Sequence, residues 1–398
     1  MESFNYNDLF KKLDRREFLD NYHDKKPYFE QGAIKDVGAI FSWADLNDLF
    51  NRPKLWTGDM IELGIEGNLV PPAQYCKYGM SRVGDQVLRP DGQRINHFLR
   101  QGATLVLDYL EGIHPGVRGV ANCIERLTGT VTSSNAYCSW QGVKGYASHF
   151  DTMCVFAIQI EGEKTWNLYK GRVNEPMEIP GSSPSEFSIE QHNSQKGPLD
   201  QQILMKPGDI LYLPRGLYHD ALATDTASLH LSFGATYLAG FTAVSMLVQE
   251  MQREEFFRKR LPHFDDQAEL SKYLTEVGSA AAKRMADPAY HERVANHMRQ
   301  NLGDKVSGQR LPIRDADRCY MTTRHEPKLI RRGQKYNLVH QGVAMEILQE
   351  NVTVVKDILS REVFWLSEIT NLESGLDKGL NQLLKDLVNH KIIWRLAG

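Results

Sequence analysis

The chain has 398 residues, of which 41% are hydrophobic and 24% are charged, and its formal net charge is −3. This balance is typical of globular proteins, and the length predicts two or three domains. Nucleic-acid binding needs clustered Lys and Arg, so the slightly acidic composition argues against a strongly basic nucleic-acid-binding protein. We therefore expect no direct binding of nucleic acid.

The N-terminal stretch MESFNYNDLFKKLDRREF carries acidic residues early and has no apolar core segment, so we expect no secretory signal. No apolar run reaches the roughly 18 residues that a membrane helix needs. The five cysteines are odd in number and form no C-x-x-C pair, which argues against a disulfide framework or a thiolate zinc site. We expect a cytoplasmic protein without a membrane segment.

Residues 1–50 predict helices with one buried face, because apolar residues such as Phe10, Leu13 and Phe18 recur at helical spacing. From Ala103 to about Tyr237 the pattern changes to short β-type runs separated by Gly, Pro, Asn and Asp. Such runs are typical of an antiparallel barrel or jelly roll. We assign residues 1–240 to a β-rich domain with a helical N-terminal segment.

After Gly240 the apolar residues recur every three or four positions, which predicts a helical region over 241–312. Residues 313–398 combine the strand-like KYNLVHQ, the helical LDKGLNQLLKDLVNH and a terminal IIWRL. This mixture is typical of a small winged-helix domain. The last helix has as many acidic as basic residues, so we expect a structural role or a protein contact there, not DNA binding.

Two separated segments carry candidate metal ligands. His149 and Asp151 form an H-x-D triplet, and in an extended chain side chains at i and i+2 point to the same face. His219 follows a later strand and its Pro-Arg-Gly turn. An H-x-D triplet alone is common by chance, but with a second histidine in this context it predicts a two-histidine, one-carboxylate iron site that leaves three coordination positions open.

Lys164 begins the strand after the H-x-D segment, across the turn at Gly162. A 2-oxo diacid bound to the metal by one end needs a cation for its distal carboxylate, and a lysine at this position can supply that charge-assisted hydrogen bond. Considered in isolation, Lys164 would more simply be an exposed lysine at the start of a strand.

These segments resemble the JmjC oxygenases, and most of all the ribosomal oxygenase group, which hydroxylates ribosomal protein side chains. The shared pattern is Asn-x-Tyr, H-x-D, Q-x-x-G-x-K-x-W and GD-x-L-Y-x-P-x-G-x-x-H, found here in NAYCSW, SHFD, QIEGEKTW and GDILYLPRGLYH. The resemblance implies a mixed α and β fold with a double-stranded β-helix, the cupin or JmjC jelly roll. It also implies Fe(II) as cofactor and 2-oxoglutarate as co-substrate.

Residue by residue, the resemblance makes His149, Asp151 and His219 the iron ligands and catalytic residues, and Lys164 the anchor of 2-oxoglutarate. It places four further residues along the co-substrate pocket: Asn135, Tyr137, Ser228 and His230. More loosely, residues 241–312 are similar to the family's dimerisation region and residues 313–398 to its C-terminal domain, which implies a homodimer. One departure is visible, because Ser139-Trp140-Gln141-Gly142 replaces the T-P-P-G loop of relatives near the substrate entrance.

Three functions stay open from the sequence. The first is hydroxylation of a protein or peptide side chain, with a ribosomal protein as the candidate substrate. The second is N-demethylation of methyl-lysine, which uses the same iron site. The third is a cupin that binds a metal or small ligand without turnover, although such a protein has no need of a buried cation at Lys164.

Overall fold

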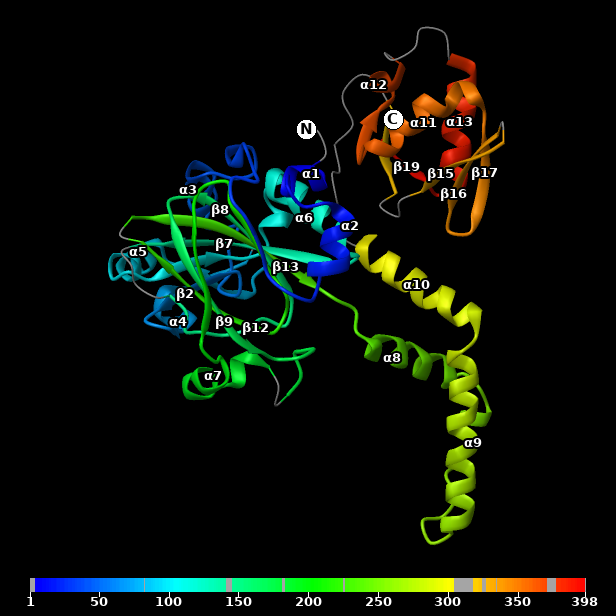
Figure 1. Ribbon diagram of the computed structural model, residues 1–398, viewed down its shortest axis with the longest axis horizontal. Coiled ribbons are helices and arrows are strands. Elements are labelled where there is room, and N and C mark those ends of the chain that lie inside the picture. Colours follow the sequence, from blue (N-terminus) through cyan, green and yellow to red (C-terminus); the bar gives the residue numbers. More distant parts are fainter. Residues whose placement is uncertain are drawn as a thin grey trace. The chain divides into compact units, whose positions relative to one another are not determined.

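The computed structural model describes residues 4–81, 83–140, 145–180, 183–224, 226–303, 318–323, 327–333, 335–370 and 377–397. The chain divides into two compact parts, of which one is Phe4–Tyr237 and the other begins at Leu238 (Figure 1). Among the described residues, no helix is both long enough and apolar enough to cross a membrane.

The larger sheet of the N-terminal part is antiparallel and has the order β1-β11-β8-β13-β7-β6-β2-β3 among the described residues. Its strands are β1 (Tyr28–Glu30), β2 (Ile61–Ile65), β3 (Asn68–Leu69), β6 (Thr104–Leu107), β7 (Val131–Ser139), β8 (Cys154–Glu161), β11 (Ile210–Leu213) and β13 (Ser228–Thr236). The mixed α and β prediction is confirmed. The prediction of helices throughout residues 1–50 is wrong at Tyr28–Glu30, because this segment pairs with β11.

A smaller antiparallel sheet of three strands faces the larger one. It has the order β10-β9-β12, with β9 (Lys164–Arg172), β10 (Leu199–Met205) and β12 (Leu217–Ala223). Trp166, Leu168 and Met205 of this sheet pack in one buried cluster with Val155, Ala157, Leu211 and Leu213 of the larger sheet. The two sheets therefore enclose a common interior, as in a jelly roll.

Strand β8 is buried on both faces and separates this interior from a second core. Phe156 and Ile158, which alternate with the interior residues of β8, pack in the larger cluster that includes the N-terminal aromatic residues and helix α6 (Pro115–Thr128). Helix α6 begins at a proline and ends at Gly129 in the left-handed conformation. The helices therefore pack against one face of the larger sheet, and its other face lines the interior between the two sheets.

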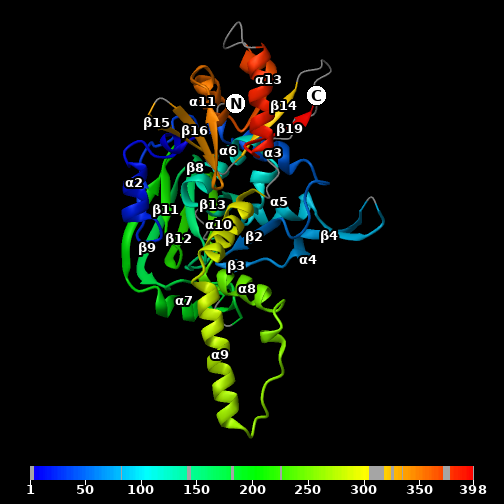
Figure 2. The same ribbon diagram turned by 90° about the vertical axis from the view of Figure 1, so that its right-hand side faces the viewer.

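The described residues of this part also form the α-helices α1 (Tyr6–Leu9), α2 (Arg15–Glu17), α3 (Trp43–Phe50), α4 (Pro72–Tyr75), α5 (Gly92–Arg100) and α7 (Ile189–Gln195). Short polar side chains cap several of them, for example Asn5 at α1 and Ser42 at α3. A two-stranded hairpin, β4 (Cys76–Met80) and β5 (Gln86–Pro90), extends away from the sheets (Figure 2).

The part that begins at Leu238 opens with three helices, α8 (Gly240–Met251), α9 (Gln267–Met285) and α10 (Pro288–Gly303). The C-terminal residues form two three-stranded sheets, β18-β14-β19 and β15-β16-β17. Their strands are β14 (Cys319–Thr322), β15 (Lys328–Arg332), β16 (Lys335–His340), β17 (Val343–Ile347), β18 (Val363–Trp365) and β19 (Ile393–Ala397). The helices α11 (Val352–Ser360), α12 (Leu366–Thr370) and α13 (Asp377–Asn389) complete it. Its assignment as a winged-helix domain stays a prediction.

Candidate metal centre and adjoining pocket

The three predicted ligands lie together at one end of the barrel. His149 and Asp151 belong to the irregular segment just before β8, and His219 lies on β12. The backbone N–H of His149 donates to the carbonyl of His219 at 3.0 Å, and the N–H of His219 donates to the carbonyl of His149 at 2.9 Å. This isolated β-bridge brings two segments that are distant in the sequence to one site.

Backbone carbonyls orient both imidazole rings. The Nδ1 atom of His149 lies 2.8 Å from the carbonyl oxygen of Ala147, and Nδ1 of His219 lies 2.9 Å from that of Leu217. A carbonyl can only accept, so each Nδ1 carries the proton and each Nε2 keeps a free lone pair. This is the tautomer that a metal ligand requires, and the carbonyls serve as the orienting partners that metal-binding histidines usually have.

The donor atoms converge. Nε2 of His149 lies 3.9 Å from Oδ1 of Asp151, and Nε2 of His219 lies 3.5 Å from Oδ2. One ligand atom from each of the three residues lies within 4.8 Å of the other two, which lets one ion contact all three. Burial lowers the pKa of His219, and His149 beside it acts in the same direction, so the neutral form that can bind a metal is favoured.

The side chain of Trp166 forms a wall beside this centre. Its ring stacks on His219, with centroids 5.8 Å apart and an interplanar angle of 24°. The same ring meets His230 edge-on at 5.5 Å. Trp166 therefore contacts both a candidate metal ligand and a residue predicted to line the co-substrate site. It is two residues from Lys164 on β9, so the two-residue period of a strand could have found it from the sequence.

Lys164 is buried in the interior between the two sheets, with 4% of its surface exposed. Its ammonium group donates to Oγ of Ser139 at 3.2 Å, and Ser139 in turn is 2.9 Å from the hydroxyl of Thr104. Among the residues that the structure describes, no carboxylate lies within ion-pair distance of Lys164. Burial lowers the pKa of Lys164 to about 8. A buried cation is expected to have a counter-charge, and here the protein supplies only hydroxyl groups in the described part.

The other residues predicted to line the co-substrate site lie on the paired strands β7 and β13. Strands β7 and β13 pair so that His230 lies opposite Tyr137, Ser228 opposite Ser139, and Ser232 opposite Asn135. The rings of Tyr137 and His230 stack at 4.8 Å, and the ammonium of Lys164 is 5.9 Å from the centroid of Tyr137. The hydroxyl of Ser228 accepts a hydrogen bond from the Gln159 amide at 2.8 Å.

Three buried polar atoms of the pocket have no hydrogen-bond partner among the described residues. They are Nε1 of Trp166, Oε1 of Gln159 and Nδ1 of His230. Gln159 and His230 are directly paired between β8 and β13, so these atoms belong to one region. Buried polar groups are normally satisfied, and a polar ligand or water in the pocket would satisfy these.

Two residues close to the candidate ligands in the sequence have structural partners. Arg215 pairs with Asp24 at 2.8 Å and also contacts Glu175, which supports a structural role for this turn arginine. Trp140 packs edge-on against Trp43. The remaining residues of the loop that departs from the family pattern, Gln141 and Gly142, lie outside the described residues.

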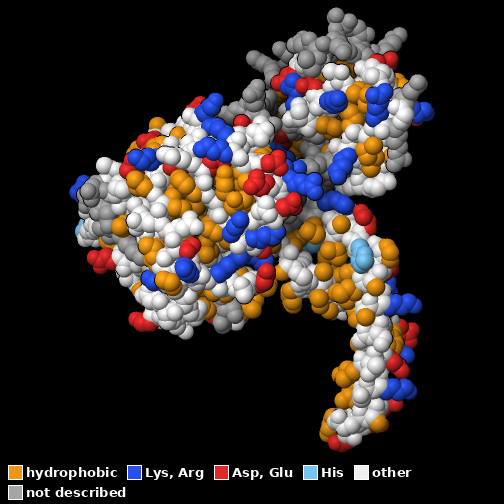
Figure 3. Space-filling view, in the orientation of Figure 1, with side chains coloured by type: hydrophobic (Ala, Val, Ile, Leu, Met, Phe, Trp, Pro, Cys, Tyr) orange, Lys and Arg blue, Asp and Glu red, His pale blue; other side chains and the backbone are white. Residues whose placement is uncertain are grey.

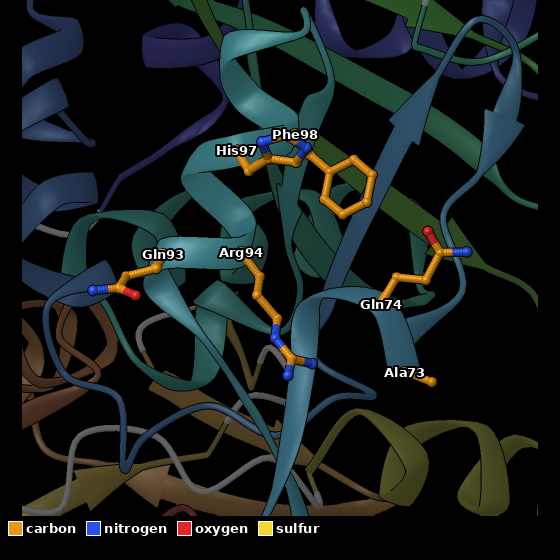
Figure 4. A pocket seen from close by; sticks show the side chains of 6 residues that line it. All are labelled: Ala73, Gln74, Gln93, Arg94, His97 and Phe98. Carbon is orange, nitrogen blue, oxygen red and sulfur yellow. The ribbon is translucent and has the colours of Figure 1, made fainter.

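A separate hollow of about 520 Å³ lies between α4 and α5 (Figure 4). It is lined by Ala73, Gln74, Gln93, Arg94, His97 and Phe98. None of the candidate ligands or pocket residues is among them, so this hollow is not part of the metal centre.

Comparison with protein families identifies the segment that carries the site. Residues 117–241 match the family model described as the JmjC domain. This segment resembles a JmjC domain. This range includes the three candidate ligands, Lys164 and the four residues predicted to line the co-substrate site, so the predicted resemblance is confirmed.

Two curated relatives have related names. The chain is 30% identical over 236 residues to the Dictyostelium discoideum protein named bifunctional lysine-specific demethylase and histidyl-hydroxylase NO66, covering 54% of this chain and 41% of that protein. It is 34% identical over 235 residues to human ribosomal oxygenase 1, covering 56% of this chain and 34% of that protein. The chain therefore spans less than half the length of these relatives.

A solved structure of Escherichia coli YcfD has a similar fold, with a TM-score of 0.58 and 14% identity, covering 96% of this chain and 98% of that one. Another structure of YcfD, described as a ribosomal oxygenase, is a complex with cobalt and 2-oxoglutarate and has a TM-score of 0.52 at 15% identity. At these identities the likeness concerns the fold. It confirms the predicted JmjC or cupin architecture.

Proposed function

We propose that the protein is an Fe(II)- and 2-oxoglutarate-dependent oxygenase that hydroxylates a protein side chain. The observation that carries this proposal is the combination of a converging His-Asp-His triad with a buried lysine that has no ion-pair partner among the described residues. A triad alone would suit many metals. The lysine adds the requirement for an anionic ligand beside the metal.

In this proposal His149, Asp151 and His219 hold the iron and leave three positions for co-substrate and oxygen. When bound, the ferrous ion supplies the oxidative decarboxylation of 2-oxoglutarate and the transfer of one oxygen atom to the substrate. Lys164 binds the distal carboxylate of 2-oxoglutarate, with Ser139 fixing the ammonium. Asn135, Tyr137 and Ser228 line the co-substrate site, and the Trp166 ring separates it from His219.

The proposed substrate is a ribosomal protein. This is supported by the names of the relatives, human ribosomal oxygenase 1 and the histidyl-hydroxylase NO66. A ribosomal substrate would place the reaction in the cytoplasm, without direct binding of nucleic acid by this chain. We also propose that the chain has three domains: a catalytic domain at 1–240, a helical dimerisation region at 241–312 and a winged-helix-like domain at 313–398. Two copies of the chain would form a homodimer.

The test is incubation of ribosomal proteins from the source organism with the protein, Fe(II), 2-oxoglutarate and oxygen, followed by mass spectrometry. Hydroxylation adds the mass of one oxygen atom to one peptide and releases succinate in equal amount. If succinate forms only with added peptides of another class, the ribosomal substrate is wrong. If no succinate and no modified peptide appear with any substrate, the oxygenase proposal is wrong.

A second candidate is N-demethylation of methyl-lysine, which is favoured by the first part of the NO66 name. The same experiment separates the two activities, because demethylation removes the mass of one methylene group. A cupin that only binds a ligand would change no peptide mass. The buried position of Lys164 argues against that third function.

A further inference from the structure

A buried polar network lies around Asp220, the residue after His219 on β12. Asp220 is 2% exposed. Its carboxylate accepts hydrogen bonds from the Ser148 hydroxyl at 2.5 Å, the Tyr169 hydroxyl at 2.8 Å and the Asn167 amide at 2.8 Å. A buried carboxylate that accepts three hydrogen bonds is well satisfied and holds its donors in fixed positions.

The donors come from the segments that build the metal centre. Ser148 immediately precedes His149, and Asp220 immediately follows His219. Neighbouring residues in extended chain point to opposite faces, so the network lies on one face of these segments and the metal ligands on the other. Asn167 and Tyr169 lie on β9, the strand that carries Lys164 and Trp166 and pairs directly with β12. The network therefore ties three segments together behind the site.

A cation completes the network. Nζ of Lys196, the residue after α7, lies 3.2 Å from the Ser148 hydroxyl and 4.7 Å from the centroid of the Tyr169 ring. This ammonium offsets part of the negative charge of Asp220 and connects the α7 segment to the same group of side chains.

We propose that Asp220 is a positioning residue for the metal centre. The backbone connection between His149 and His219 is an isolated β-bridge, not a continuous ladder. The Ser148–Asp220 hydrogen bond joins the same two segments one residue away on the opposite face. By clamping them, Asp220 sets the separation of the two imidazoles and hence the affinity for the metal. This inference rests on the proposed metal-binding role of the triad.

The test compares Asp220→Asn with a matched control, Glu30→Gln. Glu30 is also 2% exposed and accepts hydrogen bonds from the backbone of Lys11 at 2.9 Å and from the Tyr28 hydroxyl at 3.1 Å. It lies on β1, which pairs with β11 and not with the strands of the site. Each protein is titrated with Co(II) in a calorimeter, and its melting temperature is measured.

Outer groups that orient metal ligands typically contribute about 10- to 100-fold to metal affinity. Asp220 acts on the two histidines only through the segments that carry them, so we expect the Co(II) dissociation constant of Asp220→Asn to rise by about tenfold, at the lower end of this range. We expect Glu30→Gln to lower the melting temperature and leave the Co(II) dissociation constant unchanged. A folded Asp220→Asn protein with the affinity of the wild type would overturn the inference.

If Asp220→Asn does not fold, the inference is tested with the double variant Ser148→Ala/Tyr169→Phe. This variant removes two hydrogen-bond donors to Asp220 and keeps the Asp220 carboxylate. We expect several-fold weaker Co(II) binding, and an unchanged affinity would overturn the inference. The wild type is titrated beside His149→Ala. If the wild type does not bind Co(II) more tightly than His149→Ala, the proposed metal centre itself is wrong, which distinguishes that failure from a failure of the Asp220 proposal alone.

Discussion

The charge of Lys164 depends on whether a carboxylate is bound beside it. Burial lowers its pKa to about 8, and a bound carboxylate would favour the ammonium form. In the free protein Lys164 loses its proton as the pH rises through about 8, so binding of 2-oxoglutarate then requires uptake of a proton. We expect the dissociation constant for 2-oxoglutarate, measured on the Co(II)-loaded protein, to rise about tenfold per pH unit above 8.

Lys164→Arg is the matched control for this pH dependence. A guanidinium group stays charged throughout this range, so we expect its 2-oxoglutarate affinity, whatever its absolute value, to be independent of pH between about 8 and 10. A wild-type affinity that stays constant over the same range would contradict the assignment of Lys164 as the anchor.

The metal ligands give a second prediction at this scale. His149→Ala and Asp151→Ala each remove one of three donors, so we expect iron-dependent succinate release to fall by more than about 100-fold. His97→Ala serves as the control, because His97 lies on the exposed side of α5 away from the triad. Full succinate release by either ligand variant would show that the triad does not bind the catalytic ion.

At the residue scale, the sequence predicts which side chains of one short segment point to the same face. The H-x-D spacing and the later His219 turn could be identified because a strand places i and i+2 on one face. The residues that contact Lys164 and the candidate ligands could not be identified from the sequence. Ser139 reaches Lys164 from another strand, and Asp220 meets Ser148 over a sequence separation of 72 residues. Such pairs depend on strand register, which no local pattern reveals.

At the element scale, the turn between β8 and β9 determines where Lys164 begins its strand. Gly162 has a φ of +66°, and a Cβ atom there would lie 2.0 Å from the carbonyl oxygen of Ala227. We expect Gly162→Ala to lower the melting temperature and to raise the KM for 2-oxoglutarate, because the backbone next to Lys164 must move. Thermal unfolding and steady-state kinetics measure the two effects.

Gly129→Ala is the control for Gly162→Ala. Gly129 has a φ of +71° but no atom within 4 Å of the added Cβ, so it carries the backbone strain without the clash. That strain costs about 1 kcal/mol, which lowers the melting temperature by about 2–4 °C for a domain of this size. We expect a larger decrease for Gly162→Ala. Equal decreases and equal KM values in the two variants would contradict this role of the turn.

Helices and strands were predictable from the sequence where the apolar residues of a segment recur at one clear spacing. The β-type runs after Ala103 correspond to the strands from β6 to β13. Tyr28–Glu30 was predicted as helix because its neighbours are helical, whereas its strand exists only by pairing with β11. Helix α7 and the segment before it were not predicted, because this polar insertion between β9 and β10 has no strong apolar period.

At the scale of the whole molecule, helix α8 presents apolar side chains that the chain itself does not cover. Phe241, Val244 and Val248 are 69%, 44% and 47% exposed, at spacings that place them on one face of the helix. Figure 3 shows hydrophobic side chains grouped over α8. We expect the protein to sediment as a dimer that buries this face, and Val248→Glu to dissociate it into monomers.

Val343→Glu is the control for this charge substitution. Val343 is 54% exposed on β17, outside the helical region, so we expect that variant to remain dimeric. A monomeric wild type at micromolar concentration, or a Val248→Glu protein that stays dimeric, would contradict the proposed interface. The sequence predicted the helical region from its period, but the state of assembly depends on which helix face is left uncovered.

The proposed function requires one barrel to hold Fe(II) and 2-oxoglutarate together. The sharpest test is the visible charge-transfer absorption that Fe(II) develops when a 2-oxo acid chelates it, recorded without oxygen so that no turnover occurs. We predict this absorption for the wild type, its absence from His149→Ala, and a much higher 2-oxoglutarate requirement in Lys164→Ala. No absorption in the wild type at saturating iron and 2-oxoglutarate, or equal absorption in all three proteins, would contradict the proposed function.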